Sequence, residues 1–559
     1  MIDNIKLITI AMATLAVTCT ARAEVRLANI FGNRMVLQCD KPISVWGFAA
    51  PGEKVTVRFA PAKGDAQSAS STANAKGLWS VELKAMKPTF EPGKLLVEGK
   101  ASKTALSDVL IGELWLCGGQ SNMEWSLRGS LNADMEIPSA DFPNIRFYRM
   151  PHIARPKAQS DVDLKDAGKG QGIWRPCVTE NVQDCTAVGY YFARRLRRML
   201  KVPVGLIDTS WGGTMAQHWT PRKTLEGFPE MKPYIEKFDT AMKQWTDGGG
   251  EEGAKRRYAA DLKAWENTMA EARGDRKARK PNSRAYTTPA TKRQPGGMFN
   301  GMIVPIKRMR LRGVLFYQGE NNSFGESWKP FHRTFPAVIS SWRKAFGDEK
   351  LPFGIIQIAG WSSRRSMTYD MNHHTNVIRE IQFLTWRRTP GTGLIVTFDT
   401  NSTQRIHPPL KLPVGRRSAR WALAEVYGVK RWGSKDPLEW RGPIYKGMKI
   451  DGKKIVITFE PESSRSLRLD KDNDRGFYIA GKDRKFHFAR ARVFTKDKKQ
   501  MLQVWCDDVP EPVAVRYAWS NLPIGGLENS RHLPAYPFRT DTWALTPHQS
   551  TGEYHVDKK

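Results

Sequence analysis

The sequence from Val109 to Met123 is VLIGELWLCGGQSNM. It begins with a largely apolar run of the kind that forms a buried strand, and it ends in two glycines, a glutamine and Ser121. Glycines directly before a serine permit the sharp turn that exposes a nucleophilic hydroxyl above a sheet. The second glycine of the Gly-x-Ser-x-Gly nucleophile elbow is absent, so this is a different motif. Alone, such a segment is more often an ordinary loop, and the rest of the chain has to supply partners for Ser121.

Four more apolar runs follow in the middle of the chain, and each stops at a glycine or a polar cluster: Val204–Ile207, Gly313–Tyr317, Phe353–Ile358 and Leu394–Phe398. Amphipathic helical patterns lie between the runs: Thr186–Leu200, Phe331–Phe346, Thr375–Arg388 and Val414–Tyr427. Continuous apolar strands that alternate with helices are typical of a doubly wound parallel α/β sheet. Ligands of such sheets bind beyond the carboxyl ends of the strands, and catalytic residues are expected there.

The flanks of this α/β region have a different pattern. Short apolar runs broken by turn signals predict a β-domain from Val25 to about Ala105 and another from about Gly428 to Trp543. Residues 226–295 are rich in Lys, Arg, Glu, Ala and Trp, which predicts a surface helical insertion with a mobile stretch; whether it closes over the site as a lid stays open. The predicted division is a signal peptide at 1–23, an N-terminal β-domain at 24–105, an α/β domain at 106–225, the insertion at 226–295, a second α/β part at 296–430, a C-terminal β-domain at 431–545 and a tail at 546–559.

The first 23 residues have the features of an export signal. Lys6 precedes an apolar run from Leu7 to Val17, and Ala21–Ala23 offers small residues around a cleavage point. Cys19 raises a lipoprotein alternative, which the threonine before it does not favour. The apolar run is too short to span a bilayer and no later run of about 18 apolar residues exists, so no membrane span is predicted. A secreted or periplasmic protein is expected.

The charge balance is strongly basic. Lys and Arg total 88 and Asp and Glu total 56, which gives a formal net charge of +32. Such a field attracts acidic glycans, membrane headgroups or nucleic acid, although a solvated basic surface is an equally good interpretation. Nucleic-acid binding suits the charge but not the export signal. Hydrophobic residues make up 40% of the chain, which excludes wholesale disorder.

Removal of the signal leaves five cysteines, and an odd number leaves at least one thiol unpaired. They are Cys39, Cys117, Cys177, Cys185 and Cys506, of which Cys177 and Cys185 are a candidate disulfide in an oxidising compartment. No Cys-x-x-Cys and no His-Glu-x-x-His occurs. Neither a zinc site nor a dithiol redox site is therefore predicted, and no metal or other cofactor is expected.

Two further strand ends carry groups suited to an oxyanion hole. The second strand is followed by Asp208–Thr214, in which Gly212 and Gly213 allow a backbone N–H to approach a ligand oxygen closely. The third is followed by Gln318 and Glu320, an amide and a carboxylate that can donate to an oxyanion or orient a base. Each of these segments is more often a tight turn or a structural loop.

A serine nucleophile needs a base, and histidine is the side chain whose ordinary pKa lies nearest neutrality. His407 follows the fifth strand, with Asp399 upstream of it, which makes it the best base candidate. The order serine, aspartate, histidine is that of sheet hydrolases in which the histidine comes last. A serine, oxyanion donors and a histidine at separate strand ends form a combination that chance supplies rarely.

With these segments in order, the chain resembles the bacterial sialate O-acetylesterase family, carbohydrate esterases of the SGNH hydrolase superfamily. The resemblance implies an SGNH-hydrolase-like doubly wound parallel sheet flanked by N- and C-terminal β-domains. The matching segments are Met35–Gln38, Lys41–Gly47, Gly119–Met123, Thr209–Thr214, Phe299–Ile303, Tyr317–Glu320, Arg379–Gln382, Ile406–Pro408 with Lys411 and Val414–Gly415, Pro512–Tyr517 and Phe538–Asp541.

The resemblance also implies the roles of the site residues. Ser121 would be the nucleophile and His407 the general base. The amides of Ser121 and Gly213 and the side chain of Gln318 would hold the oxyanion, with Gly212 as the alternative glycine. The matched segments supply four supporting residues: Gln120, Asn122, Glu320 and Arg379.

The chain departs from the family pattern at two places. Many relatives carry Asp two residues before the histidine, where this chain has Arg405. The orienting acid is therefore open between Asp399, the first choice, and Glu320, and a Ser–His dyad is a third arrangement. Relatives often have Pro and Glu-Ala in the segment that here contains Met215 and Gln217–His218, which predicts a shifted substrate preference.

The function that the resemblance implies is hydrolysis of acetyl esters on an acetylated carbohydrate, a sialate first, by a serine acyl-enzyme. A deacetylase of another glycan, acetylated xylan or a sulfated polysaccharide, is the alternative within the enzyme class. A non-catalytic glycan-binding protein, carried by the β-domains and their tryptophans, is the alternative outside it.

Overall fold

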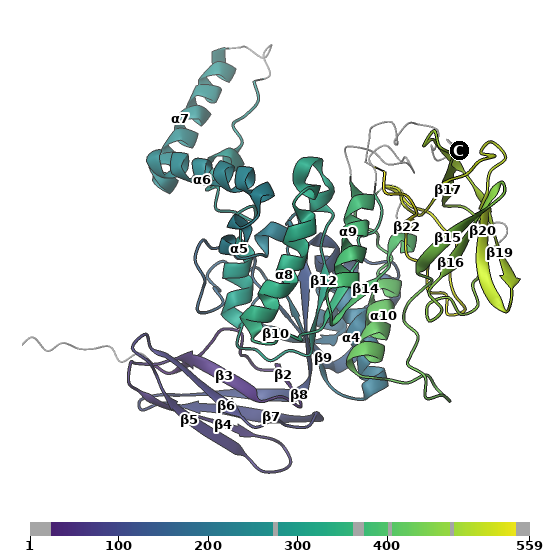
Figure 1. Cartoon of the computed structure of the whole chain (residues 1–559). Helices are drawn as coiled ribbons and strands as arrows, with labels where there is room; N and C mark the ends of the chain where they lie inside the picture. Colours follow the sequence, from purple (N-terminus) through teal and green to yellow (C-terminus); the bar gives the residue numbers. More distant parts are fainter. Residues whose placement is uncertain (1–23, 272–277, 362–373, 401–404, 470–473, 544–559) are drawn as a thin grey trace, which may run out of the picture.

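The computed structural model describes residues 24–271, 278–361, 374–400, 405–469 and 474–543. The predicted signal peptide at 1–23 and the tail at 546–559 lie outside the described residues. Between two β-rich ends lies an α/β region (Figure 1). Its strands pair in the order β10-β9-β11-β8-β12-β13-β14. Their bounds are β8 Lys103–Gly119, β9 Asp141–Arg149, β10 Trp174–Val178, β11 Val204–Asp208, β12 Gly313–Tyr317, β13 Phe353–Ile356 and β14 Thr392–Ile395.

The pairs from β9 through β14 are parallel, and β10 is antiparallel to β9, so the sheet is mixed. All five strands expected from the sequence are present in it. Strands β9 and β10 were not expected, because only Ile145–Tyr148 of β9 is a continuous buried run and prolines interrupt both segments.

Helices cover both faces of this sheet. Trp342 of α8 packs against Phe353, with ring centroids 6.0 Å apart, whereas Trp421 of α10 covers the next residue, Gly354. Because successive strand residues point to opposite faces, α8 and α10 lie on opposite sides. α4 packs beside α10, and α9 beside α8. The bounds are α4 Ala187–Leu200, α8 Phe331–Phe346, α9 Thr375–Arg388 and α10 Leu412–Trp421, with shorter α1 Ser121–Glu124, α2 Ala133–Glu136 and α3 Thr179–Val182.

The amino-terminal β region is continuous with the α/β sheet through β8. The first half of β8 pairs antiparallel with β7, and its second half pairs parallel with β11 and β12. The division expected between residues 105 and 106 falls inside this strand. The other strands are β1 Arg26–Leu27, β2 Val36–Gln38, β3 Ile43–Phe48, β4 Lys54–Ala60, β5 Gln67–Thr72, β6 Leu78–Leu83 and β7 Thr89–Glu98.

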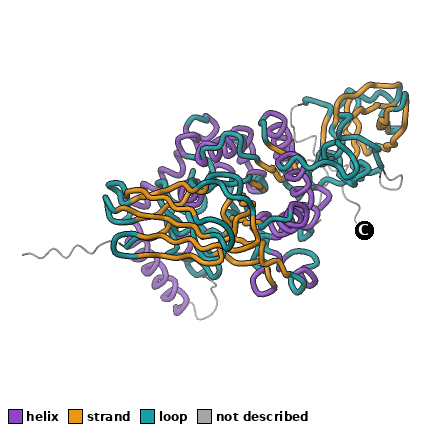
Figure 2. Tube along the Cα trace, turned by 90° about the horizontal axis from the view of Figure 1, so that it is seen from below, coloured by secondary structure: helices purple, strands orange, loops and turns teal. Residues whose placement is uncertain are grey.

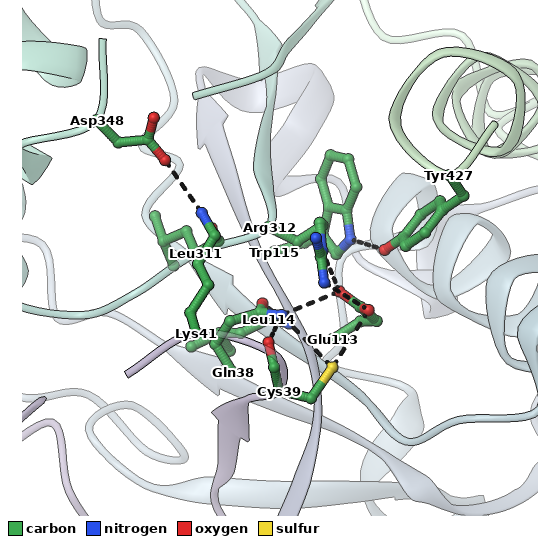
Figure 3. Close-up of polar contacts among 10 residues, drawn as sticks. All are labelled: Gln38, Cys39, Lys41, Glu113, Leu114, Trp115, Leu311, Arg312, Asp348 and Tyr427. Atoms are coloured by element: carbon green, nitrogen blue, oxygen red, sulfur yellow. Dashed lines mark hydrogen bonds and ion pairs between the residues drawn. The ribbon is translucent and has the colours of Figure 1, made fainter. Parts of the chain in front are cut away.

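A buried polar cluster joins the amino-terminal region to the start of the parallel strands (Figure 3). Glu113 of β8 is 5% exposed and accepts hydrogen bonds from Arg312 Nε at 2.6 Å and Gln38 Nε2 at 3.1 Å. The Cys39 thiol lies 3.3 Å from the same carboxylate, and burial together with the charge of Glu113 raises the pKa of that thiol. The cluster lies at the sheet edge opposite to Ser121, because Arg312 directly precedes β12.

The insertion between the two α/β parts is helical, as expected, and comprises α5 Arg222–Glu226, α6 Lys232–Asp247 and α7 Gly250–Glu271. α7 projects away from the α/β region in Figure 1. The carboxyl-terminal region has two sheets among the described residues, β15-β16-β20-β19 and β18-β17-β21-β22. Figures 1 and 2 place this region and the amino-terminal one at opposite ends of the molecule. Its strands are β15 Tyr445–Asp451, β16 Lys454–Phe459, β17 Phe477–Ala480, β18 Phe486–Phe488, β19 Arg490–Lys496, β20 Lys499–Trp505, β21 Ala514–Tyr517 and β22 Phe538–Arg539.

All five cysteines of the described residues are free thiols, and those of Cys177 and Cys185 are in hydrogen-bond contact. In the ranges that the structure describes, no helix is long and apolar enough to cross a membrane.

Candidate active site

Ser121 occupies a sharp turn between β8 and the short helix α1. Gly119 has φ +124°, and a Cβ there would lie 2.1 Å from the Tyr317 carbonyl oxygen, so only glycine fits. The neighbouring Gln120 N–H donates to that carbonyl at 3.0 Å. The end of β12 thereby fixes the turn and leaves Ser121 partly exposed.

His407 meets Ser121 across 286 residues of sequence. Its Nε2 lies 2.7 Å from Ser121 Oγ, and its ring stacks on Trp125, with centroids 5.3 Å apart and planes 26° apart. Burial lowers the pKa of His407; the charge of Lys411 lowers it further, and Glu124 opposes the shift. The imidazole is therefore neutral at pH 7 and able to accept the serine proton.

The first-choice orienting acid, Asp399, does not reach this imidazole. Both its carboxylate oxygens accept hydrogen bonds from Arg417 of α10, at 2.7 and 2.6 Å. The fork of a guanidinium matches a carboxylate in this way, and the pair lies at the surface. Among the described residues, no carboxylate is hydrogen-bonded to His407.

The second choice, Glu320, acts on the serine turn through Asn122. The Glu320 side chain is buried, and its Oε1 accepts from Asn122 Nδ2 at 2.5 Å. The same amide nitrogen donates to the Ile406 carbonyl at 3.0 Å, beside His407. Asn122 thus ties the nucleophile turn to the histidine loop.

Lys411 completes this buried network and was not singled out as a site residue in the sequence. Its Nζ donates to Asn122 Oδ1 at 2.5 Å. Burial lowers the pKa of Lys411 to about 7, against the charge of Glu320, and burial raises the pKa of Glu320 to about 7. A lysine four residues after a histidine gives no sequence signal that it is buried.

The two glycines of the β11 turn have different roles. The Gly212 N–H donates to Glu124 Oε2 at 2.7 Å, so this amide is already committed. The Gly213 N–H has no acceptor in the described part of the chain, and the same holds for the Ser121 N–H. Gly213, with φ +74°, and Ser121 are therefore the backbone donors left open at the site.

Gln318 and Gln120 form the buried floor of the site. Gln318 Nε2 donates to Gln120 Oε1 at 2.7 Å and to the Thr214 carbonyl at 2.9 Å. Because these two bonds use both amide hydrogens, neither points freely toward an oxyanion. Gln318 instead links the β8 and β11 turns.

Arg379 lies away from Ser121 and His407. It is buried on α9, where its Nη2 donates to the Ser520 carbonyl of the carboxyl-terminal region, and burial lowers its pKa to about 9. Its contacts join these two parts of the molecule and do not include Ser121 or His407.

Four partly exposed residues near the turns were missed by the sequence analysis: Glu124, His152, Trp211 and Lys292. The His152 and Trp211 rings stack at 4.8 Å, and His152 Nε2 lies 3.3 Å from Glu124 Oε1. Lys292 Nζ donates to the Gly212 carbonyl at 3.1 Å. Within the described ranges, no group of three His, Cys, Asp or Glu side chains is arranged to hold a metal ion.

Comparison with known proteins finds related enzymes. The chain is 27% identical over 548 residues to the sialate O-acetylesterase of Mus musculus, covering 92% of this chain and 94% of the mouse protein. It is 25% identical over 548 residues to that of Homo sapiens, covering 92% of each. It is a homologue of these enzymes. No family model matches the chain.

A solved structure is also similar. The carbohydrate acetylesterase from Xanthomonas citri superposes with a TM-score of 0.71 at 29% identity, covering 93% of this chain and 100% of that one. Together the relatives support a carbohydrate O-acetylesterase function, which is that of a carboxylic-ester hydrolase.

Proposed function

We propose that the protein is a carbohydrate O-acetylesterase of the SGNH type that removes acetyl groups from glycans, sialates first, through a serine acyl-enzyme. The observation that carries the proposal is the 2.7 Å contact between His407 Nε2 and Ser121 Oγ. It joins a base with a depressed pKa to a hydroxyl held in a glycine turn, as acyl transfer requires.

The reaction has two steps. His407 accepts the Ser121 proton as the hydroxyl oxygen attacks the acetyl carbonyl, and the N–H groups of Ser121 and Gly213 stabilise the oxyanion. The imidazolium returns the proton to the departing sugar oxygen. Water, activated by His407, then attacks the acyl-serine and releases acetate.

We propose a Ser–His dyad in which packing replaces an orienting acid. The Trp125 face holds the imidazole plane, and Asn122 holds the backbone before His407 through the Ile406 carbonyl. Asp399 is bound to Arg417 and Glu320 to Asn122, so both carboxylates act elsewhere. The hydrogen bond from Gln318 to Gln120 holds the turns after β12 and β8 together beneath the site.

The export signal predicted at 1–23 supports a secreted or periplasmic location, where glycans are encountered. The net charge of +32 favours an anionic glycan over neutral xylan. An anionic substrate predicts that kcat/KM falls as salt is raised.

Acetate release from a panel of acetylated sialosides, xylans and sulfated glycans tests the proposal. Ser121→Ala and His407→Ala are each expected to lower kcat by a thousandfold or more, on the order reported for catalytic serine and histidine removal. A Ser121→Ala protein that keeps full activity would overturn the assignment. Glycan binding that survives this change, with no acetate released by the parent, would favour a binding module.

A further inference from the structure

The Gly212 carbonyl and the Gly213 N–H belong to one planar peptide unit. Lys292 Nζ lies 3.1 Å from the Gly212 oxygen, and a Cβ built on Gly213 would lie 2.8 Å from the same ammonium nitrogen. A cation is thus seated against the peptide whose N–H is the open donor at the site. In a trans peptide the N–H points away from the carbonyl, so the ammonium leaves that donor free.

The segment that carries Lys292 is anchored by a chain of hydrogen bonds. The Met215 N–H donates to His218 Nδ1 at 3.1 Å, which assigns the ring hydrogen to Nε2. His218 Nε2 lies 2.8 Å from Tyr234 Oη, and that hydroxyl donates to the Arg293 carbonyl at 2.5 Å. The β11 turn, α6 and the residue after Lys292 are thereby linked.

His218 is suited to this neutral relay. Its side chain is fully buried, and burial, with the charges of Arg293 and Lys292, lowers its pKa to about 3. The ring therefore keeps one acceptor and one donor nitrogen at neutral pH. The 215–218 segment, which the sequence analysis associates with substrate preference, contacts Tyr234 of α6 through His218.

Other side chains hold the rest of the turn. Glu124 occupies the Gly212 N–H at 2.7 Å, and Asn321 Nδ2 donates to the Gly213 carbonyl at 2.9 Å. Only the Gly213 N–H of this pair of glycines is unoccupied among the described residues. Of the two glycine amides in this turn, only that of Gly213 is therefore left for an oxyanion.

We propose that Lys292, delivered by the helical insertion, is a positioning residue that fixes and polarises the Gly212–Gly213 peptide as the oxyanion donor. A hydrogen bond from a cation to an amide oxygen strengthens the N–H of the same amide as a donor. Preorganised donors act on the transition state more than on bound substrate, so the effect appears in kcat. This inference rests on the proposed acetylesterase function.

The test uses the full-length protein and p-nitrophenyl acetate. This ester is neutral, so it has no anionic group that a lysine could bind. Lys292→Met is expected to lower kcat by about tenfold, less than the loss of a whole oxyanion donor, with KM changed less than twofold. Lys292→Arg is expected to restore most of the rate. Lys263→Met, which removes an exposed charge from α7 of the same insertion, is the matched control and should stay within about twofold of the parent.

A transition-state analogue gives a readout that does not depend on turnover. An alkyl boronic acid forms a tetrahedral adduct with an active serine, and Lys292→Met should weaken its binding by the same factor as kcat. Equal thermal melting of Lys292→Met and Lys263→Met excludes a folding effect. Unchanged kcat and boronate affinity, or a rise in KM confined to anionic substrates, would overturn the role proposed for Lys292. Activity retained by Ser121→Ala would instead overturn the proposed function itself.

Discussion

The His407 ring stacks on Trp125, and its Nε2 contacts Ser121 Oγ. The positive charge of Lys411 acts on it from within the protein, where burial also disfavours the imidazolium. Both effects keep the base unprotonated at neutral pH, and both oppose the imidazolium that forms during attack. The pH dependence of kcat/KM measures how far these two effects lower the pKa of His407.

Lys411→Gln is expected to raise the pKa of His407, because it removes a like charge and keeps a hydrogen-bond donor to Asn122. The acid limb of kcat/KM should move to higher pH, since Lys411 is charged below its own pKa of about 7. The measurement is the rate on a neutral acetyl ester from pH 4 to 8. A limb that stays in place or moves to lower pH contradicts this electrostatic role.

The Asp399→Asn variant tests whether the site is a Ser–His dyad or a triad that includes Asp399. Because the Asp399 carboxylate is bound to Arg417 at the surface, its loss should change kcat by less than about threefold. A true triad aspartate is worth roughly ten thousandfold. Steady-state kinetics of Asp399→Asn beside His407→Ala decides between the two, and a loss above a hundredfold would reinstate Asp399.

The contact between Ser121 and His407 was predictable from the sequence, because the carboxyl ends of strands in a parallel sheet converge. The side chains that complete the site were not. The bonds of Gln318 to Gln120 and of Glu124 to Gly212 depend on rotamers and on the meeting of separate loops. Sequence spacing carries no information on either.

At the scale of elements, the turn from β8 into α1 is set by backbone geometry. Gly119→Ala places a Cβ 2.1 Å from the Tyr317 carbonyl oxygen at φ +124°, so it should destabilise the fold by about 3 kcal/mol or more. Gly52→Ala is the control, because Gly52 also has positive φ, +77°, but a Cβ there meets nothing within 4 Å. Its expected cost is about 1 kcal/mol.

Chemical denaturation of both variants checks this prediction. Equal losses would mean that backbone strain alone sets the cost and that the β12 carbonyl yields to the methyl group.

The same elements show what sequence patterns carry. The bounds of β12 and α8 were predicted to the residue. A strand buried on both faces gives a continuous apolar run, and a helix buried along one stripe gives a period of about 3.6 residues. β9 and β10 were missed, because β9 pairs with β10 and with β11, and these pairings depend on contacts between separate segments of the chain. The division of the chain into domains stays a prediction.

At the scale of the whole molecule, the cluster around Glu113 joins regions that the sequence separates. Glu113→Ala should lower the free energy of unfolding by roughly 3–5 kcal/mol, because it leaves the partly buried Arg312 without its partner. kcat should stay within about twofold of the parent in the folded protein, since the cluster is at the edge opposite to Ser121. Glu82→Ala, which breaks an exposed pair with Arg310, should cost less than about 1 kcal/mol.

Urea unfolding and ester hydrolysis of the two variants provide the comparison. A large fall in kcat for Glu113→Ala, without loss of structure, would show that the cluster is coupled to the chemistry.

Strand β8 spans Lys103 to Gly119, one residue short of Gln120 and two short of Ser121. Asp108, with φ +56°, and the shifts in register against β7 mark a bulge within the strand, between the part that pairs with β7 and the part that pairs with β11 and β12. A module on a flexible tether could swing and sample many distances from Ser121, but two modules that share one strand keep one relative placement. No cut at residue 105 would therefore yield two self-sufficient pieces.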